Sequence, residues 1–357
     1  MSEERITAYG KLIIDVRREL LKYITELARF GRRRYEILEV ERLRRYVGKL
    51  DDNFFEYENY IAVDGASFML NLMVGMIGLY ATIAVKFPEV RRIYYRESFG
   101  VVPTVEGVQE ISDTLTFSRM LDLSREIAFL KTCVRLVNEY SPDLLILDGS
   151  LLPVPRTGLE DKHEYLNDLY YKYIKWMLSL HETCRNKGIP LVGFVKRVRS
   201  KFLTERAPNV RVVLDQELKS ALNLQYQLYD NLLTESFLTF REYFPKVLPL
   251  VHYENLPELS ISFVFIKTAR SLPPYRVDFG GALISNNNVN EGECLNVLKF
   301  LCKETTVDGL PYCILKVDEE VKLSRALMRD LYDDIVHRYF KEAGDVSFVL
   351  TLWGESL

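Results

Sequence analysis

Two segments of the sequence share a pattern in which an apolar run ends in aspartate followed by glycine. They read AVDG at 62–65 and ILDG at 146–149. An ionised carboxylate beside a core is costly unless it is paired or binds a cation, and the glycine lets the backbone turn away and a ligand approach. Two such strand ends side by side would offer the oxygen ligands that Mg²⁺ or Mn²⁺ takes. The pattern predicts a divalent-metal site at Asp64 and Asp148; the alternative is a pair of ordinary Asp-Gly turns.

Three further groups of charged residues could serve such a site. Glu126 lies in a helical segment that could pack across the sheet and place a third carboxylate beside the strand ends. A solvent-exposed position on that helix is the simpler interpretation. Lys196 follows the apolar run 189–195 and begins the sequence KRVRSK. A cation there would neutralise a phosphate, whereas a solvated basic loop explains the run equally well. The arginines of 29–45 form either a solvated helix face or a phosphate-facing patch.

Other chemistries lack their motifs. The four histidines show no metal-ligand spacing, and no G-x-S-x-G elbow, P-loop or G-x-G-x-x-G follows a strand. Hydrolase triads, NTPases and dinucleotide enzymes are therefore disfavoured. The net charge of −3, from 47 basic and 50 acidic residues, excludes a uniformly basic coat but leaves room for a local basic patch beside carboxylates.

The cysteines and the apolar segments indicate the compartment. Five scattered cysteines without a C-x-x-C pair argue against a disulfide framework or structural zinc and favour a reducing cytoplasm. The first residues lack a signal-peptide pattern. The most apolar run, 68–85, contains Asn71 and two glycines and alternates like a strand, so we expect no membrane association.

Periodicity predicts an α/β fold with a mixed sheet flanked by helices and with functional groups at strand ends. Helices are expected at 11–49, 115–140, 160–187, 292–304 and 323–343, and strands at 60–65, 75–85, 90–95, 144–147, 189–195, 261–267, 275–279 and 346–352. Residues 205–260 are expected to be mostly helical and irregular.

With Asp64, Asp148 and Lys196 in that order, the chain resembles the NurA nucleases, DNA-end-processing enzymes with a ribonuclease H-like core. The resemblance rests on the first-aspartate segment 60–67 and on LLILDGSLL at 144–152, GFVKR at 193–197, PYRVDFG at 274–280 and GLPYCILKVD at 309–318. It implies a single nuclease domain over 1–357. Its parts are an N-terminal helical arm (1–55), a core sheet (56–204), a mid-chain helical insertion (205–260) and a C-terminal part that completes the core (261–357).

The resemblance also implies roles for individual residues. Asp64, Glu126 and Asp148 would bind metal, with Glu139 as a competitor for Glu126, and Lys196 would contact phosphate. At the C-terminal motif the family usually carries an aromatic residue and a histidine, where this chain has Leu310 and Asp318. A carboxylate suits a hard ion, so Asp318 is expected to act as a catalytic ligand. The expected DNA contacts are Lys196, Arg197, Arg199, Tyr275, Arg32 and Arg33.

The function implied by the resemblance is hydrolysis of DNA phosphodiesters with two Mn²⁺ or Mg²⁺ ions. Family members act as 5′-3′ exonucleases on single- and double-stranded DNA and as single-strand endonucleases. They work in DNA end resection and repair as homodimers with the hexameric HerA translocase. The departures at Leu310 and Asp318 motivate an alternative, a non-catalytic DNA- or translocase-binding module. An enzyme for a small phosphorylated substrate is a third hypothesis.

Overall fold

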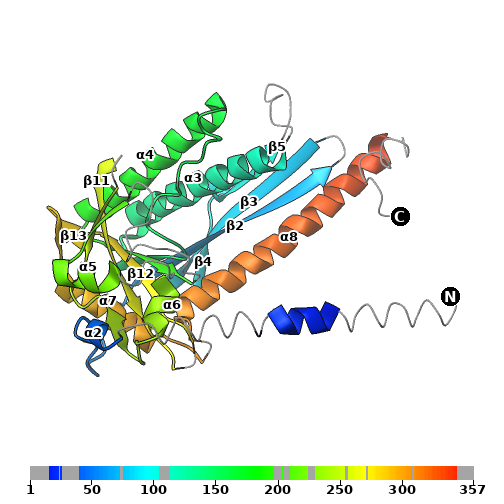
Figure 1. Cartoon of the computed structure of the whole chain (residues 1–357). Helices are drawn as coiled ribbons and strands as arrows, with labels where there is room; N and C mark the ends of the chain where they lie inside the picture. The colour runs from blue at the N-terminus through cyan, green and yellow to red at the C-terminus, as the bar shows by residue number, and fades with distance from the viewer. Residues whose placement is uncertain are drawn as a thin grey trace.

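The molecule is built around one twisted sheet with helices on both faces (Figure 1). The structure is a computed structural model that describes residues 16–23, 25, 40–72, 75–103, 113–196, 203, 210–223, 230–253, 256–270, 272–307 and 309–343. Within these residues the sheet contains twelve strands, in the order β1-β9-β11-β12-β7-β6-β2-β3-β4, with β5 beside β3 and with β10 and β8 beyond β11.

The strands have these bounds: β1 Gly48–Lys49, β2 Tyr60–Leu72, β3 Gly75–Phe87, β4 Arg91–Ile93, β5 Phe99–Pro103, β6 Leu144–Leu147, β7 Pro190–Val195, β8 Val210–Val213, β9 Glu242–Phe244, β10 Leu250–Tyr253, β11 Leu256–Ile266 and β12 Tyr275–Gly281. A separate small hairpin joins β13 (Ile284–Ser285) and β14 (Asn288–Val289).

The centre of the sheet is parallel and its two sides are antiparallel. β6 lies between β2 and β7 and runs parallel to both. Its four residues are all apolar and buried, as expected for a strand covered on both faces. β2 and β3 form a long antiparallel hairpin, and β7 continues through antiparallel pairs into β12 and β11. This mixed sheet, with helices on its faces, confirms the predicted fold class.

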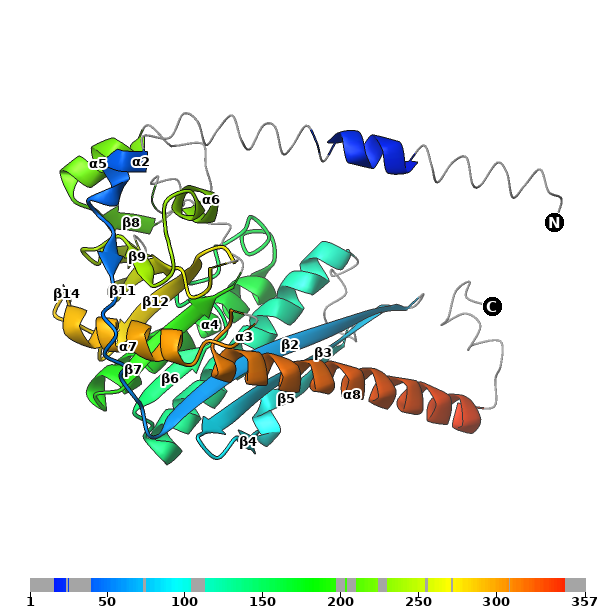
Figure 2. The ribbon, with the colours of Figure 1, turned by 90° about the horizontal axis from the view of Figure 1, so that it is seen from below.

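Helices cover both faces of the long hairpin. Gly78 of β3 lies directly against Leu121 of α3 (Thr114–Tyr140), whereas Ala66 of β2 packs with Val321 of α8 (Tyr312–Ala343). Figures 1 and 2 show α8 running along the hairpin and α4 (Glu164–Asn186) lying beside α3. The remaining elements are α2 (Val40–Arg44), the 3₁₀ turn η1 (Arg96–Ser98), α5 (Gln216–Asn223), α6 (Asp230–Glu235) and α7 (Glu291–Lys303).

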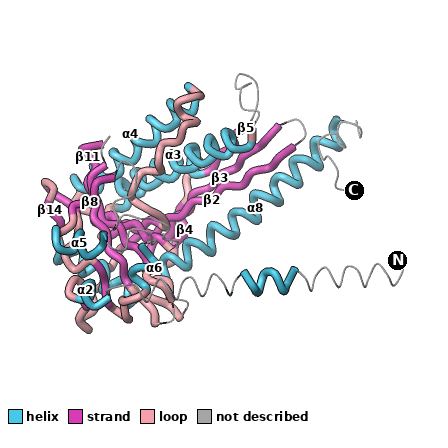
Figure 3. Tube along the Cα trace, in the orientation of Figure 1, coloured by secondary structure: helices cyan, strands magenta, loops and turns pink. Residues whose placement is uncertain are grey.

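The structure corrects three expectations. The segment 205–260 is not mostly helical: it holds the short helices α5 and α6, but also β8, β9, β10 and the start of β11 (Figure 3). These strands are short and complete the sheet through long-range pairing that local periodicity does not reveal. The last helix, expected at 323–343, begins at Tyr312. The N-terminal arm is helical at 16–23 and in α2 but ends in the strand β1, which pairs with β9.

Two further points concern the ends of the chain and the membrane. The expected strand at 346–352 lies outside the described residues, as does most of the arm before Val40. Among the described residues, no helix combines the length and the apolar composition needed to cross a bilayer.

Candidate metal centre

The register between β2 and β6 brings Asp64 and Asp148 together. The two strands run parallel with Val63 opposite Leu147, so the residues that follow are neighbours. β6 ends at Leu147, and the N–H of Asp148 donates to the Val63 carbonyl at 2.9 Å. Asp148 therefore lies at a strand end, as expected. Asp64 does not, because β2 continues to Leu72 along β3; Asp64 marks the point at which β2 loses β6 as a neighbour.

A third carboxylate comes from α8, far along the chain. The two-residue alternation of a strand puts Asp64 on the same face of β2 as Ala66, and Ala66 packs against α8. Asp318, less than one turn before Val321, projects to the same place. One carboxylate oxygen each from Asp64, Asp148 and Asp318 lie within 4.8 Å of one another. We call these three residues the aspartate cluster.

Lys196 connects two members of the aspartate cluster. It directly follows β7, and its ammonium donates to Asp148 Oδ2 at 2.6 Å and to Asp318 Oδ1 at 2.9 Å. Lys322, one turn further along α8, lies 2.5 Å from the other oxygen of Asp318. Burial lowers the pKa of Lys196, but the two carboxylates outweigh this and raise it above its ordinary value. The lysine is therefore a permanent cation at this site.

The aspartate cluster concentrates negative charge where water is scarce. Burial, and then the charge of Asp148, raise the pKa of Asp64 from 3.8 to about 7. Burial likewise raises the pKa of Asp148, despite its bond to Lys196. A divalent cation would stabilise all three ionised carboxylates, and oxygen donors of this kind are those that Mn²⁺ and Mg²⁺ prefer. The donor set thus fits the predicted metal.

A buried network, which the sequence reasoning missed, fixes the loop that carries Asp148. Asp278 of β12 is fully buried and accepts hydrogen bonds from Ser150 Oγ at 2.9 Å and from the Leu151 N–H at 3.0 Å. Arg276, also buried, pairs with Asp278 at 2.7 Å and donates to Ser150 Oγ. The signal was present: PYRVDFG places two opposite charges at i and i+2 in an apolar strand, hence on one face.

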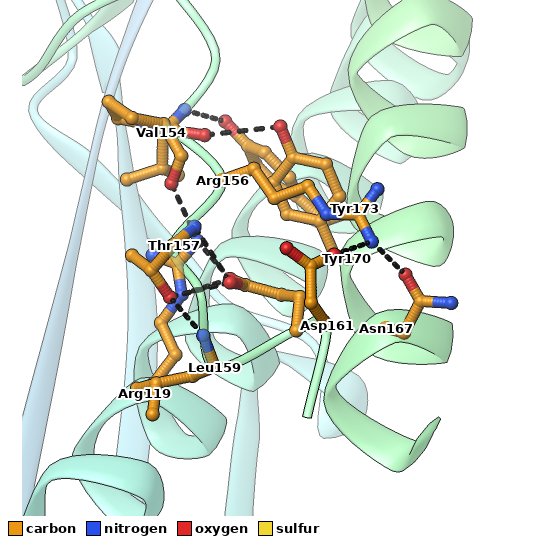
Figure 4. Close-up of polar contacts among 11 residues, drawn as sticks. Arg119, Val154, Arg156, Thr157, Leu159, Asp161, Asn167, Tyr170 and Tyr173 are labelled. Atoms are coloured by element: carbon orange, nitrogen blue, oxygen red, sulfur yellow. Dashed lines mark hydrogen bonds and ion pairs between the residues drawn. The ribbon is translucent and has the colours of Figure 1, made fainter. Parts of the chain in front are cut away.

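The aspartate cluster opens into a cavity of about 890 Å³. One wall is the segment 152–155 with Tyr173 of α4 behind it. The wall is held by hydrogen bonds that Figure 4 shows, including the Val154 N–H to Tyr173 Oη at 2.9 Å. Buried Glu160 pairs with Arg119 at 2.6 Å and accepts a hydrogen bond from the Thr157 N–H, and these contacts fix the turn that follows the wall. The cavity wall is therefore preorganised.

Glu126 lines the same cavity but is not part of the aspartate cluster. Its helix, α3, lies on the other face of β2, where a Cβ added to Gly65 would meet Phe129 and Arg125. The Glu126 carboxylate pairs instead with Arg125 at 2.5 Å. Its role as a ligand remains a prediction. Glu139, the competing residue, is paired with Arg135 and Tyr95 at a half-exposed position, and it does not line this cavity.

The expected DNA contacts are only partly visible. Tyr275 is buried and packs on Phe194 with ring centroids 5.1 Å apart; its contact with DNA remains a prediction. Arg32, Arg33, Arg197 and Arg199 lie outside the described residues. Two cations that the sequence reasoning passed over, Arg125 and Lys322, line the cavity together with Lys196 and Leu310.

Comparison with known proteins gives a consistent result. The chain is similar to the NurA nuclease from Sulfolobus solfataricus, with 16% identity and a TM-score of 0.60 over 95% of this chain and 98% of that one. It is also similar to a NurA structure with manganese, with 12% identity and a TM-score of 0.50 over 88% and 98% of the two chains. No curated protein matches. The family model for the NurA domain matches residues 58–323, three-quarters of the sequence. The chain therefore belongs to the NurA family.

Proposed function

We propose that the protein is a divalent-metal-dependent nuclease that hydrolyses DNA phosphodiesters at the aspartate cluster. The observation that carries the proposal is the convergence of Asp64, Asp148 and Asp318 within 4.8 Å, with Lys196 bonded to two of them. Membership of the NurA family supports the same activity, as does the manganese named for a similar NurA structure. Mn²⁺ or Mg²⁺ is the proposed cofactor, with two ions per site.

Each residue has a role that follows from its contacts. The three aspartates supply oxygen ligands, with Glu126 on the cavity wall as a fourth candidate. When bound, the metal would activate water and stabilise the charge on the phosphate oxygens. Lys196 holds the side chains of Asp148 and Asp318 and keeps a positive charge in the cavity, where it would bind a phosphate oxygen of the substrate. The Asp278 network keeps the Asp148 loop in place.

The finer activities come from the family resemblance. They are 5′-3′ exonuclease action on single- and double-stranded DNA and endonuclease action on single strands, in DNA end resection and repair. We further propose that the protein acts as a homodimer, in the cytoplasm, together with a HerA-type hexameric translocase. The cavity of about 890 Å³, large enough for more than one nucleotide, is compatible with a polymeric substrate.

The test is a titration with Mn²⁺ and Mg²⁺ of cleavage of 5′-labelled single- and double-stranded DNA. Asp64→Ala and Asp148→Ala are expected to abolish cleavage while the protein stays folded. Asp168→Ala, an exposed position on α4, is the matched control and should cleave like the wild type. Cleavage that survives both cluster variants would refute the proposal. DNA binding without turnover in either metal would favour the non-catalytic module.

A further inference from the structure

A second cavity, of about 630 Å³, lies beside strands β1 and β9 and is strongly basic. Its lining includes four cationic side chains and one carboxylate: Lys49, Arg241, Lys267, Arg270 and Asp52. Asp52 is 96% exposed and pairs with Arg241 at 2.5 Å. Among the described residues, the other three cations form no ion pair. We call this cavity the basic pocket. Its uncompensated charge suits an anion.

The basic pocket is held together by backbone contacts among three segments that are distant in the sequence. Arg241 adopts a left-handed conformation with φ of 64°. Its N–H donates to the Lys267 carbonyl at 2.9 Å, and its own carbonyl accepts from the Leu50 N–H at 3.1 Å. A non-glycine residue in this conformation is strained and persists only where its surroundings hold it. The pocket is therefore a built feature and not a chance grouping of flexible side chains.

An aromatic ring adds to the chemistry of the basic pocket. Half-buried Phe240 lines it, and the guanidinium groups of Arg241 and Arg270 lie 5.3 Å and 6.0 Å from the ring centroid. Cations with an aromatic platform are the combination by which proteins bind single-stranded nucleic acid: the cations take the phosphates and the ring stacks on a base.

The sheet places the basic pocket on the same edge as the aspartate cluster. Val195, just before Lys196, pairs with Arg276 at the start of β12, and Tyr275 pairs with Ile266 at the end of β11. Ile266 in turn pairs with Tyr243 of β9. Lys267 and Arg241, which flank this pair of strands, therefore lie at the same edge as Lys196. Counted from β6, the strand that ends before Asp148, β11 and β9 lie three and four strand spacings away. At about 4.8 Å per spacing, about 14–19 Å separate the two sites.

We propose that the basic pocket binds the phosphate backbone of a DNA strand whose scissile phosphate lies at the aspartate cluster. The proposal rests on the proposed nuclease function and adds a subsite to it. At the ~3.4 Å rise of a stacked strand, the pocket holds the phosphate four to six nucleotides from the cut. Oligonucleotides of three residues cannot reach both sites, whereas longer strands can.

The test compares Lys267→Gln/Arg270→Gln with a control that removes the same charge at exposed positions elsewhere, Lys175→Gln/Arg211→Gln. Binding of labelled dT20 and dT3 is measured without divalent metal over a range of salt concentrations. The pocket variant should bind dT20 at least about tenfold more weakly, with the slope of log Kd against log salt reduced by about 0.7 for each lost phosphate contact. Its affinity for dT3, which can occupy only one of the two sites at a time, should fall by a smaller factor. The control variant should match the wild type.

Three results would overturn the proposal: an unchanged salt slope for dT20 in the pocket variant, an equal loss for dT3, or an equal loss in the control. Stabilisation of the wild type by inorganic phosphate, without any change in dT20 binding on mutation, would assign the pocket to a small free anion and also overturn it. Because binding is measured without cleavage, wild-type protein that binds dT20 through the pocket but cuts no DNA would refute the nuclease function and leave the subsite standing.

Discussion

Gly193 of β7 is the position where one added carbon should disturb the metal centre most directly. A Cβ there would lie 2.6 Å from the carbonyl oxygen of Gly149 and 3.0 Å from the N–H nitrogen of Leu151. Both atoms are backbone of the loop that carries Asp148, so no rotamer change relieves the clash. To reach an ordinary contact of 3.4 Å, the loop must move by about 0.8 Å. Overpacking of this kind costs about 1–3 kcal/mol of stability.

The functional cost of Gly193→Ala should be larger than the loss of stability suggests. A displacement near 1 Å at a catalytic group lowers the rate by about 10²-fold, and the shift acts directly on Asp148. The assay is kcat/KM on 5′-labelled DNA with Mn²⁺, beside urea unfolding. Gly158→Ala is the matched control, because nothing lies within 4 Å of its Cβ. A Gly193→Ala protein with wild-type rate and stability, or an equal loss in Gly158→Ala, would refute the reasoning.

Two other perturbations test separate parts of the structure. Burial lowers the pKa of His181 from 6.5 to about 3, so between these values the unfolded chain binds a proton that the native state does not. The free energy of unfolding should fall by about 1.4 kcal/mol per pH unit below pH 6.5, or by about 2 kcal/mol at pH 5. Urea unfolding of the wild type and of His181→Leu over this pH range measures the fall. The same pH dependence of stability in the variant would show that His181 is not its cause. Asp318→Asn should raise the Mn²⁺ concentration for half-maximal cleavage at least about tenfold, whereas Asp318→His, the residue usual in the family, should retain cleavage. Unchanged metal dependence in Asp318→Asn would argue against its role as a ligand.

The sequence was informative where the signal is local. Four apolar residues between the helix stop Ser-Pro-Asp at 141–143 and the turn signal Asp-Gly at 148–149 are typical of a short buried strand. β6 and the position of Asp148 after it were therefore predictable, as were β7 and Lys196. The Asp64 strand was also recognised, but its end was misplaced. The residues after Asp64 alternate in a way that suits strand pairing, and the hairpin with β3 carries β2 on to Leu72.

The insertion at 205–260 and the helix of Asp318 show the limit of local patterns. β9 has three residues and β10 four, too short for periodicity to distinguish from loop, and both form because β11 offers them an edge. The helix α8 begins at Tyr312 because its first turns pack on β2 and β3. The burial of Val321 against Ala66 and Ala81 is part of this packing.

The sequence by itself determined that Asp148 and Lys196 follow buried strands of an α/β sheet and that Asp64 belongs to another strand, because apolar runs, glycines and charges are read residue by residue. Only the tertiary structure decided which of them meet. It joined Asp318 to Asp64 and Asp148, turned Glu126 toward Arg125 on the other face, and buried Asp278 and Arg276 beneath the Asp148 loop. The reason is physical: strand neighbours and helix faces are set by packing between segments that are far apart in the sequence, and no local pattern encodes that choice.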